Sequence, residues 1–122
     1  MLFQLTEPEW AVMQALWQGK SMTLGQITTA LEPIKHWSRN TVHTYLTRME
    51  GKGLVSIHRE TDPHLYQAAV DRDLCASGAR NTLLERVYDG AAGDLIAAFL
   101  KESSITSQER ERLRKLLDEM EV

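Results

Sequence analysis

The chain has 122 residues, of which 43% are hydrophobic and 25% charged, and its formal net charge is −3. This length excludes a large multidomain enzyme, and the composition is that of an ordinary globular domain. The single cysteine, Cys75, excludes an internal disulfide bond, and the longest apolar run, residues 95–100, is too short to cross a membrane. We therefore expect a cytoplasmic protein without membrane contact.

Charge is distributed unevenly along the chain. Residues 73–122 carry seven bases and ten acids and account for the whole imbalance, whereas residues 1–72 are neutral. Within the neutral part, residues 35–59 contain five bases, one acid and three histidines. This segment predicts a basic surface of the kind that binds nucleic acid.

A capping box predicts the first helix. Thr6 is placed to accept a hydrogen bond from the amide of Glu9, whose side chain can bond back to the amide of Thr6. Gly19 ends this helix after about three turns. Apolar residues recur at helical spacing within it and predict a buried face: Trp10, Met13, Leu16 and Trp17.

A second capping box, formed by Thr23 and Gln26, predicts a helix of about two turns. We expect it to run through Leu31 and to be stopped by Pro33. Proline lacks an amide proton, and it disfavours the helical conformation of the residue before it.

Ser38 is the N-cap of a third predicted helix, which Gly51 and Gly53 end. One side carries apolar residues at i, i+3, i+4 and i+7, namely Val42, Tyr45, Leu46 and Met49. The other side carries Asn40, His43, Thr44, Thr47 and Arg48. Asparagine, histidine and threonine side chains suit the major groove of DNA. A solvated face of an ordinary amphipathic helix has the same pattern, so the residues alone leave both interpretations open.

The spacing of apolar residues changes after Gly53. Residues 54–59 and 65–70 are predicted to be two strands, joined by a turn at residues 61–64. Three helices followed by a hairpin, with a basic third helix, are typical of a winged helix-turn-helix domain in a mainly α chain. We assign this domain to residues 1–70.

Residues 71–122 are predicted to be helical and to form a dimerisation region. A long helix begins near Asp71 and breaks at Asp89-Gly90, a short apolar helix covers residues 93–100, and a capping box at Thr106 opens the last helix. Short isolated helices are marginal in water, so their apolar stripes need a partner. A second copy of the chain is the simplest candidate, and packing back onto the winged helix is the alternative.

Three features are more specific than these patterns. They are the set Trp10, Met13 and Trp17; the stretch from Trp37 to Met49 followed by Lys52-Gly53-Leu54; and the break at Val87-Tyr88-Asp89-Gly90. Through them, residues 5–120 resemble the penicillinase repressor (BlaI/MecI) family of bacterial transcription regulators, proteins associated with antibiotic resistance. The resemblance implies a homodimeric repressor without catalytic activity, in which each winged helix binds one half of a palindromic double-stranded operator.

The resemblance also favours DNA contact by the basic segment. The candidate DNA-binding residues are Ser38, Arg39, Asn40, Thr41, His43, Thr44, Thr47, Arg48, Lys52 and Arg59. We expect Arg39, Arg48 and Lys52 to contact phosphates. In the hairpin, Arg59 with His58 and His64 is a candidate for contact with the DNA backbone, and a solvated turn is the alternative interpretation. Better-known members carry basic residues at the positions of Asn40 and His43, so we expect a different base preference.

The resemblance implies roles for the C-terminal half as well. The candidate dimerisation residues are Val87, Tyr88, Leu95, Ile96, Phe99, Leu100, Leu113, Leu116, Leu117 and Met120. In the penicillinase branch, a membrane metalloprotease system leads to cleavage of the repressor at an Asn-Phe bond. The matching bond here is Ala98-Phe99, which makes a regulatory protease a candidate partner.

No metal or cofactor is expected. The four histidines lie on different predicted elements, and the cysteine-rich tail of copper-responsive relatives is absent. Cys75 stands among acidic residues, which raise a thiol pKa, so we expect it to be unreactive. The alternative function is a winged-helix adaptor that binds a protein through the acidic half and does not bind DNA.

Overall fold

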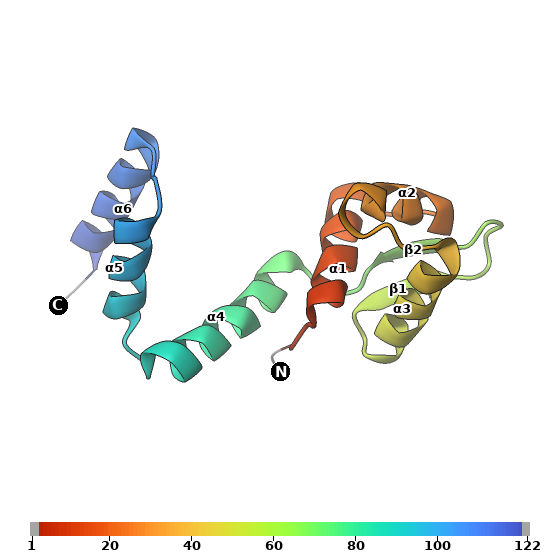
Figure 1. Cartoon of the computed structure of the whole chain (residues 1–122), viewed down its shortest axis with the longest axis horizontal. Helices are drawn as coiled ribbons and strands as arrows, with labels where there is room; N and C mark the ends of the chain where they lie inside the picture. The colour runs from red at the N-terminus through yellow and green to blue at the C-terminus, as the bar shows by residue number, and fades with distance from the viewer. Residues whose placement is uncertain (1–2, 121–122) are drawn as a thin grey trace. The chain divides into compact units, whose positions relative to one another are not determined.

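The computed structural model describes residues 3–120, which form six helices and a two-stranded sheet (Figure 1). Their order is α1 (Glu7–Gly19), α2 (Leu24–Lys35), α3 (Arg39–Gly51), β1 (Val55–His58), β2 (Leu65–Ala68), α4 (Arg72–Tyr88), α5 (Ala92–Glu102) and α6 (Ser107–Glu119). The chain divides into two compact units, one ending at Arg80 and the other beginning at Asn81. Three helices and a hairpin in the first unit confirm the predicted winged helix-turn-helix class.

Side-chain caps set the helix starts that the sequence predicts. At α1, the amide of Glu9 donates to the hydroxyl of Thr6 at 3.4 Å, and the amide of Thr6 donates to Glu9 Oε1 at 2.9 Å. The same reciprocal pairing opens α2 at Thr23 and α6 at Thr106. At α3, Ser38 Oγ accepts from the amide of the third helical residue at 3.2 Å. Each cap satisfies an amide that has no partner within the helix.

The second helix is longer than the sequence predicts. α2 continues through Pro33 to Lys35 and ends at His36, which is left-handed with φ 54°. The prediction that Pro33 stops the helix is wrong. Its fixed φ is helical, and near the end of the helix it removes only one amide donor. The amide of His36 still donates to the carbonyl of Glu32 at 3.2 Å.

One hydrophobic core holds the first unit together. Its buried residues come from the first three helices, the turn after α3 and the hairpin: Val12, Met13, Leu16, Ile27, Leu31, Val42, Leu46, Met49, Leu54, Val55 and Tyr66. Trp10 and Trp17 are half-buried, and their rings meet edge to face with centroids 6.1 Å apart. The indole N–H of Trp17 donates to the carbonyl of Val70 at 3.0 Å, which fixes the chain after β2 against α1.

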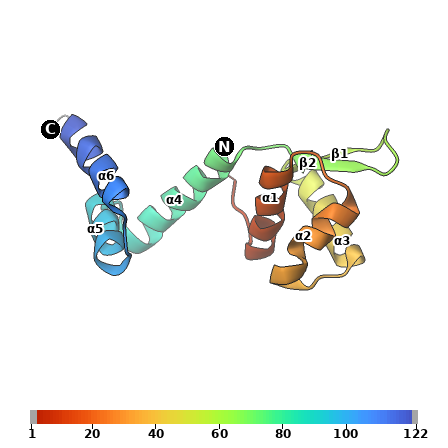
Figure 2. The ribbon, with the colours of Figure 1, turned by 90° about the horizontal axis from the view of Figure 1, so that it is seen from above.

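The hairpin is antiparallel and has one further pairing partner. Val55 of β1 lies opposite Ala68 of β2. Met22, just before α2, exchanges two backbone hydrogen bonds of 2.9 and 2.8 Å with Tyr66 of β2. This pairing satisfies part of the outer edge of β2 and fixes the start of α2 to the sheet. Figure 2 shows the loop between β1 and β2 projecting beyond α1, α2 and α3, as the wing of this fold does.

A buried carboxylate joins α1 to the end of α3. Glu9 is only 5% exposed, and its Oε2 accepts a hydrogen bond of 2.6 Å from Nζ of Lys52, the C-cap of α3. Burial alone would raise the pKa of Glu9. Hydrogen bonds from Lys52 and from the amide of Thr6, together with the Lys52 charge, hold that pKa below its ordinary value instead. The ionised pair therefore stabilises the packing of α1 with α3.

α4 begins and ends where the sequence predicts. Asp71 accepts a hydrogen bond of 2.9 Å from the amide of Leu74, in the first turn of the helix. After Tyr88 the backbone turns left-handed at Asp89 and Gly90, with φ values of 48° and 81°. The break at Asp89-Gly90 is therefore confirmed.

The second unit keeps large apolar side chains at its surface. Neither α5 nor α6 has a fully buried residue. The exposed apolar residues from α5 to the end of α6 are Ile96, Phe99, Leu100, Ile105, Leu116, Leu117 and Met120. Leu100, Leu113 and Leu117 line a shallow hollow of about 230 Å³. Both helices are thus amphipathic, with apolar residues that the second unit itself does not cover.

Glu9→Gln tests the buried ion pair. Glutamine keeps the capping box but loses the charge that Lys52 pairs with, so we expect a loss of about 1–2 kcal/mol in the free energy of unfolding at neutral pH. The folded-state pKa of Glu9 is lowered, so its contribution is present above the unfolded-state pKa and is lost as pH falls through the folded value. The difference between the two proteins should therefore shrink below about pH 4.5.

Denaturant unfolding followed by tryptophan emission is the measurement, because Trp10, Trp17 and Trp37 all lie in the first unit. Glu7→Gln is the matched control, since it removes an exposed carboxylate of the same helical turn that pairs with Lys35. An equal loss for both variants would contradict a special role for Glu9.

Candidate nucleic-acid interface

α3 presents its polar face outward, opposite the buried stripe of Val42, Leu46 and Met49. At about 100° per residue, the centre of this face is formed by four residues: Asn40, His43, Thr44 and Thr47. The side chains of Asn40, His43 and Thr47 are exposed, and Thr44 is half-buried. The face therefore combines an amide, an imidazole and two threonines on one side of a helix.

The two threonines of this face have their hydroxyl protons engaged within the helix. Thr44 Oγ1 donates to the carbonyl of Asn40, and Thr47 Oγ1 donates to the carbonyl of His43, each at 3.0 Å. These i−4 bonds leave a methyl group and acceptor lone pairs for an external partner. Within residues 3–120, the side chains of Asn40 and His43 form no hydrogen bond and are available for one.

Ser38 and Thr41 serve the start of α3. Ser38 Oγ donates to Thr41 Oγ1 at 3.1 Å and accepts from the Thr41 amide. Just before them, Trp37 stacks on Tyr45 with ring centroids 4.8 Å apart, and Lys35 Nζ lies 5.7 Å from the centre of the Trp37 ring. These contacts fix the turn between α2 and α3, and so the direction in which α3 points.

Ion pairs occupy three of the five basic residues in the segment 35–59. Lys35 pairs with Glu7, and Lys52 pairs with Glu9. Arg59 pairs with Glu50 through both terminal nitrogens. Arg39 and Arg48 remain, and in the described part of the chain neither forms an ion pair.

Arg39 and Arg48 lie at the two edges of the polar face. They are nine residues apart, which corresponds to about 13 Å along α3 and about half a turn around it. Both side chains are exposed. The four central residues therefore stand between two free guanidinium groups, an arrangement that matches a groove floor flanked by two phosphate backbones.

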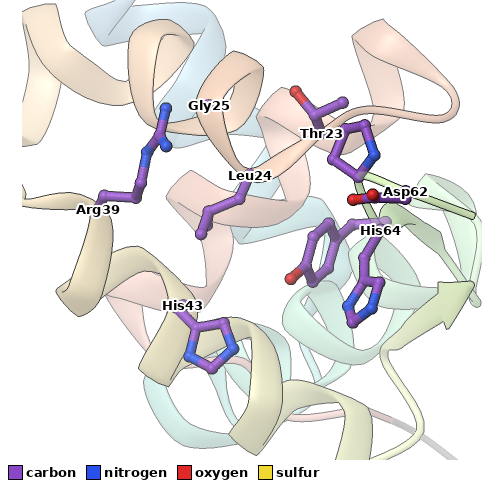
Figure 3. A pocket seen from close by; sticks show the side chains of 9 residues that line it. Thr23, Leu24, Gly25, Arg39, His43, Asp62 and His64 are labelled. Carbon is purple, nitrogen blue, oxygen red and sulfur yellow. The ribbon is translucent and has the colours of Figure 1, made fainter. Parts of the chain in front are cut away.

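A hollow of about 490 Å³ separates α3 from the wing loop. Figure 3 shows Arg39 and His43 projecting from α3 on one side, and Asp62 and His64 lying on the wing loop at the other. The guanidinium of Arg39 lies against Gly25 of α2, where a Cβ atom would come within 2.8 Å of its Nη2. Gly25 thus leaves room for this position of Arg39, a relation that no pattern in the sequence indicates.

The basic and histidine side chains of the wing differ in whether they have a partner. Arg59 is held by Glu50, and hydrogen bonds from Arg59 lower the pKa of this carboxyl group. His58 lies 3.2 Å from a carboxylate oxygen of Glu60. His64 is exposed at the hollow and forms no hydrogen bond within the described residues. The sequence does not indicate that Lys52 pairs with Glu9 or that Arg59 pairs with Glu50, because neither pair has the spacing of neighbours on one helix.

The residues expected to dimerise lie on α4, α5 and α6, with Met120 at the C-cap of α6. Tyr88, Leu95 and Leu113 are half-buried, and the other seven are exposed. At the bond expected to be cleaved, Ala98 is half-buried and Phe99 is 56% exposed. Both residues lie within α5.

Burial, with a smaller effect of the Asp71 charge, raises the pKa of the Cys75 thiol, in the direction that its acidic neighbours predict. Residues 3–120 contain no group of three or more histidine, cysteine or acidic side chains that could hold a metal ion. No helix in this range is long and apolar enough to span a membrane.

Known proteins share both the sequence pattern and the fold. Residues 5–119 match the sequence model of a family described as penicillinase repressor. The penicillinase repressor of Staphylococcus aureus is 25% identical over 117 residues, which cover 96% of this chain and 93% of that protein. The methicillin resistance regulatory protein MecI of S. aureus strain N315 is 24% identical, with 95% and 94% covered.

A solved structure agrees with these sequence matches. The structure of the monomeric form of Bacillus licheniformis BlaI, in complex with the blaP half-operator, superposes with a TM-score of 0.52 at 26% identity. The match covers 60% of this chain and 89% of that one. Because the family match spans nearly the whole chain, the chain belongs to the penicillinase repressor family.

Proposed function

We propose that this chain is a cytoplasmic, sequence-specific DNA-binding repressor that acts as a homodimer on a palindromic operator. The observation that carries the proposal is the polar face of α3, with two unpaired arginines at its edges and hydrogen-bonding side chains at its centre. BlaI, whose fold this chain shares, is bound to a half-operator in its solved structure. Membership in the penicillinase repressor family supports the same function.

In this proposal, α3 enters the major groove. Asn40 pairs with adenine, His43 donates to guanine N7, and the methyl groups of Thr44 and Thr47 contact thymine methyls. Arg39 and Arg48 contact phosphates on the two sides of the groove. Ser38, Thr41 and Lys52 orient α3, since their side chains are engaged in its caps and in the Glu9 ion pair.

A second copy of the chain is the proposed partner of the exposed apolar residues on α4, α5 and α6. Two joined copies would bind two half-sites at once, and linking them raises the effective concentration of each at the operator. A twofold dimer places its half-sites one or more helical turns apart, about 34–36 Å per turn.

Proteolysis near Ala98-Phe99 is the proposed route of derepression, with a regulatory protease as the partner. Cleavage there would separate most of α5 from α6 and so divide the proposed dimer surface. The two DNA-binding units would no longer be joined, and operator affinity would fall. Detection of only intact chain while the target gene is induced would contradict this route.

The competing function is a protein-interaction adaptor that does not bind DNA. A mobility-shift titration of bulk duplex DNA at low and high salt separates the two. The repressor is expected to shift the duplex with a steep salt dependence, because bound cations replace counterions on the phosphates. An adaptor would give no shift at either salt concentration.

Arg48→Ala and Asn40→Ala should weaken DNA binding in different ways. Arg48→Ala is expected to reduce affinity for all duplexes about equally and to lower the salt slope by about 0.9. Asn40→Ala should cost about 1–3 kcal/mol at one base position and leave the salt slope unchanged. Arg112→Ala, which removes the same charge from α6, is the control. If Arg48→Ala and Asn40→Ala lost equal affinity both for a duplex selected by the unaltered protein and for random duplexes, the roles assigned to Arg48 and Asn40 would be wrong.

Gly25→Ala should affect stability and DNA binding in opposite directions. Alanine is favoured over glycine in a helix by about 1 kcal/mol or less, so the free energy of unfolding should rise slightly. The new methyl group would displace the guanidinium of Arg39, so DNA affinity should fall about as far as it does in Arg39→Ala. Unfolding and anisotropy titrations measure the two effects. Unchanged affinity in Gly25→Ala, with a loss in Arg39→Ala, would show that this position of Arg39 is not the bound one.

Leu116→Asp should dissociate the proposed dimer. An unpaired carboxylate buried between two copies is expected to raise the dimer dissociation constant about a hundredfold or more. Sedimentation equilibrium measures the change. Gln108→Asp adds the same charge to the first turn of α6, away from the exposed apolar residues, and should leave the dimer intact. A Leu116→Asp protein that stays dimeric would exclude this surface.

A further inference from the structure

We propose that Glu50 and Arg59 form a positioning pair that holds the wing at a fixed angle to α3, and that Arg59 is not itself a phosphate ligand. This inference rests on the proposed DNA-binding function. It gives Arg59 a role different from the one that its charge alone suggests, and it gives the one acid in the basic segment a function.

The pair is a bidentate contact between a guanidinium group and a carboxylate. Arg59 Nη1 donates to Glu50 Oε2 at 2.7 Å, and Nη2 donates to Glu50 Oε1 at 2.9 Å. Two parallel bonds of this kind fix the orientation of both groups as well as their distance. The Glu50 side chain is about one-third exposed and the Arg59 side chain about half, so water competes with the pair and its effect on overall stability is small.

The pair attaches the far end of β1 to α3. At the near end, the chain leaves α3 through a turn at Gly53, and the amide of Leu54 donates to the carbonyl of Met49 at 3.0 Å. Four residues of extended strand follow, which span about 13 Å. Arg59 comes directly after them and returns to the last turn of α3 through Glu50. The buried Val55 and Tyr66 and the pairing of Tyr66 with Met22 hold the base of the hairpin, and the Glu50–Arg59 pair adds an attachment of its far end to α3.

The charges around the pair favour a positioning role over DNA contact. Glu50 already accepts one hydrogen bond from each terminal nitrogen, so a phosphate could take the same bidentate position only by breaking the pair. If Arg59 turned to a phosphate, it would leave the Glu50 carboxylate beside a polyanion without its counterion. In the described residues, the cations of α3 without an ion pair are Arg39 and Arg48. The wing residues exposed at the hollow opposite His43 are Asp62, Pro63 and His64. The pair thus controls where His64 stands relative to α3.

The two roles of Arg59 predict opposite signs for Glu50→Gln. If Arg59 acts through Glu50, the loss of the carboxylate frees the wing and weakens DNA binding. If Arg59 binds phosphate, the same substitution releases the arginine, removes a repulsive charge and tightens binding. Glu60→Gln is the matched control, because it removes the same charge from the wing loop and leaves the Glu50–Arg59 pair intact.

The experiment uses the full chain and a duplex that the unaltered protein has selected from a random-sequence pool. Anisotropy titrations between about 50 and 200 mM salt give the affinity and the salt slope. We expect Glu50→Gln and Arg59→Gln each to weaken binding about three- to tenfold, and the double variant to lose no more than either. Arg59→Lys, which keeps the charge but not the fork, should also bind more weakly, and no salt slope should change.

Several outcomes would overturn the inference. They are tighter binding by Glu50→Gln, a salt slope lowered by about 0.9 in Arg59→Gln, full affinity in Arg59→Lys, or no effect of any variant. Tryptophan emission at the assay temperature verifies that each variant is folded. If the unaltered chain selects and binds no duplex, the proposed function fails instead. Binding by the unaltered chain together with one of the overturning results removes only the positioning role.

Discussion

The burial of one side of α3 is the constraint on which the rest of the structure depends. Val42, Leu46 and Met49 are fully buried in the core of the first unit, so α3 cannot rotate about its axis without exposing them. The cap at Ser38 fixes where α3 begins, and the Glu9–Lys52 pair holds its end against α1. The polar face is thereby given a fixed direction. Core packing, rather than any feature of the polar residues themselves, decides which side chains a partner can meet.

Side-chain pairing changes the meaning of the charge count. The basic segment has five bases and one acid, but its cations find carboxylates both inside and outside the segment. Glu7 and Glu9 lie in the first turn of α1, far away in sequence, and they pair with Lys35 and Lys52. The acids of α1 thus contribute to the architecture of the basic side of the molecule. Among the five bases of the segment, Arg39 and Arg48 have no ion pair within the described residues.

Much of the fold follows from local sequence signals. The capping boxes at Thr6, Thr23 and Thr106 and the apolar spacing of the third helix involve residues three or four apart, and the structure confirms them. The prediction at Pro33 was wrong because a proline near the end of a helix costs little free energy, since it removes only one amide donor there.

The sequence predicts less of the candidate site than of the fold. Its outward residues follow from helical spacing, but the pairing of Lys52 with Glu9 bridges 43 positions, and the contact of Arg39 with Gly25 requires the packed arrangement of two helices. The DNA contacts, the dimer and the cleavage site remain predictions, since each depends on a second molecule.

The small number of free cations on α3 bears on how such a protein would search a chromosome. Affinity for arbitrary duplex comes almost entirely from charge neutralisation, and each bound cation adds to it regardless of the bases. Since Arg39 and Arg48 are the unpaired cations of α3 among residues 3–120, visits to unrelated stretches would be brief and strongly weakened by physiological salt. The residence time at a specific site would then depend on complementary contacts with base edges. The vast excess of unrelated genomic positions would compete less for each molecule.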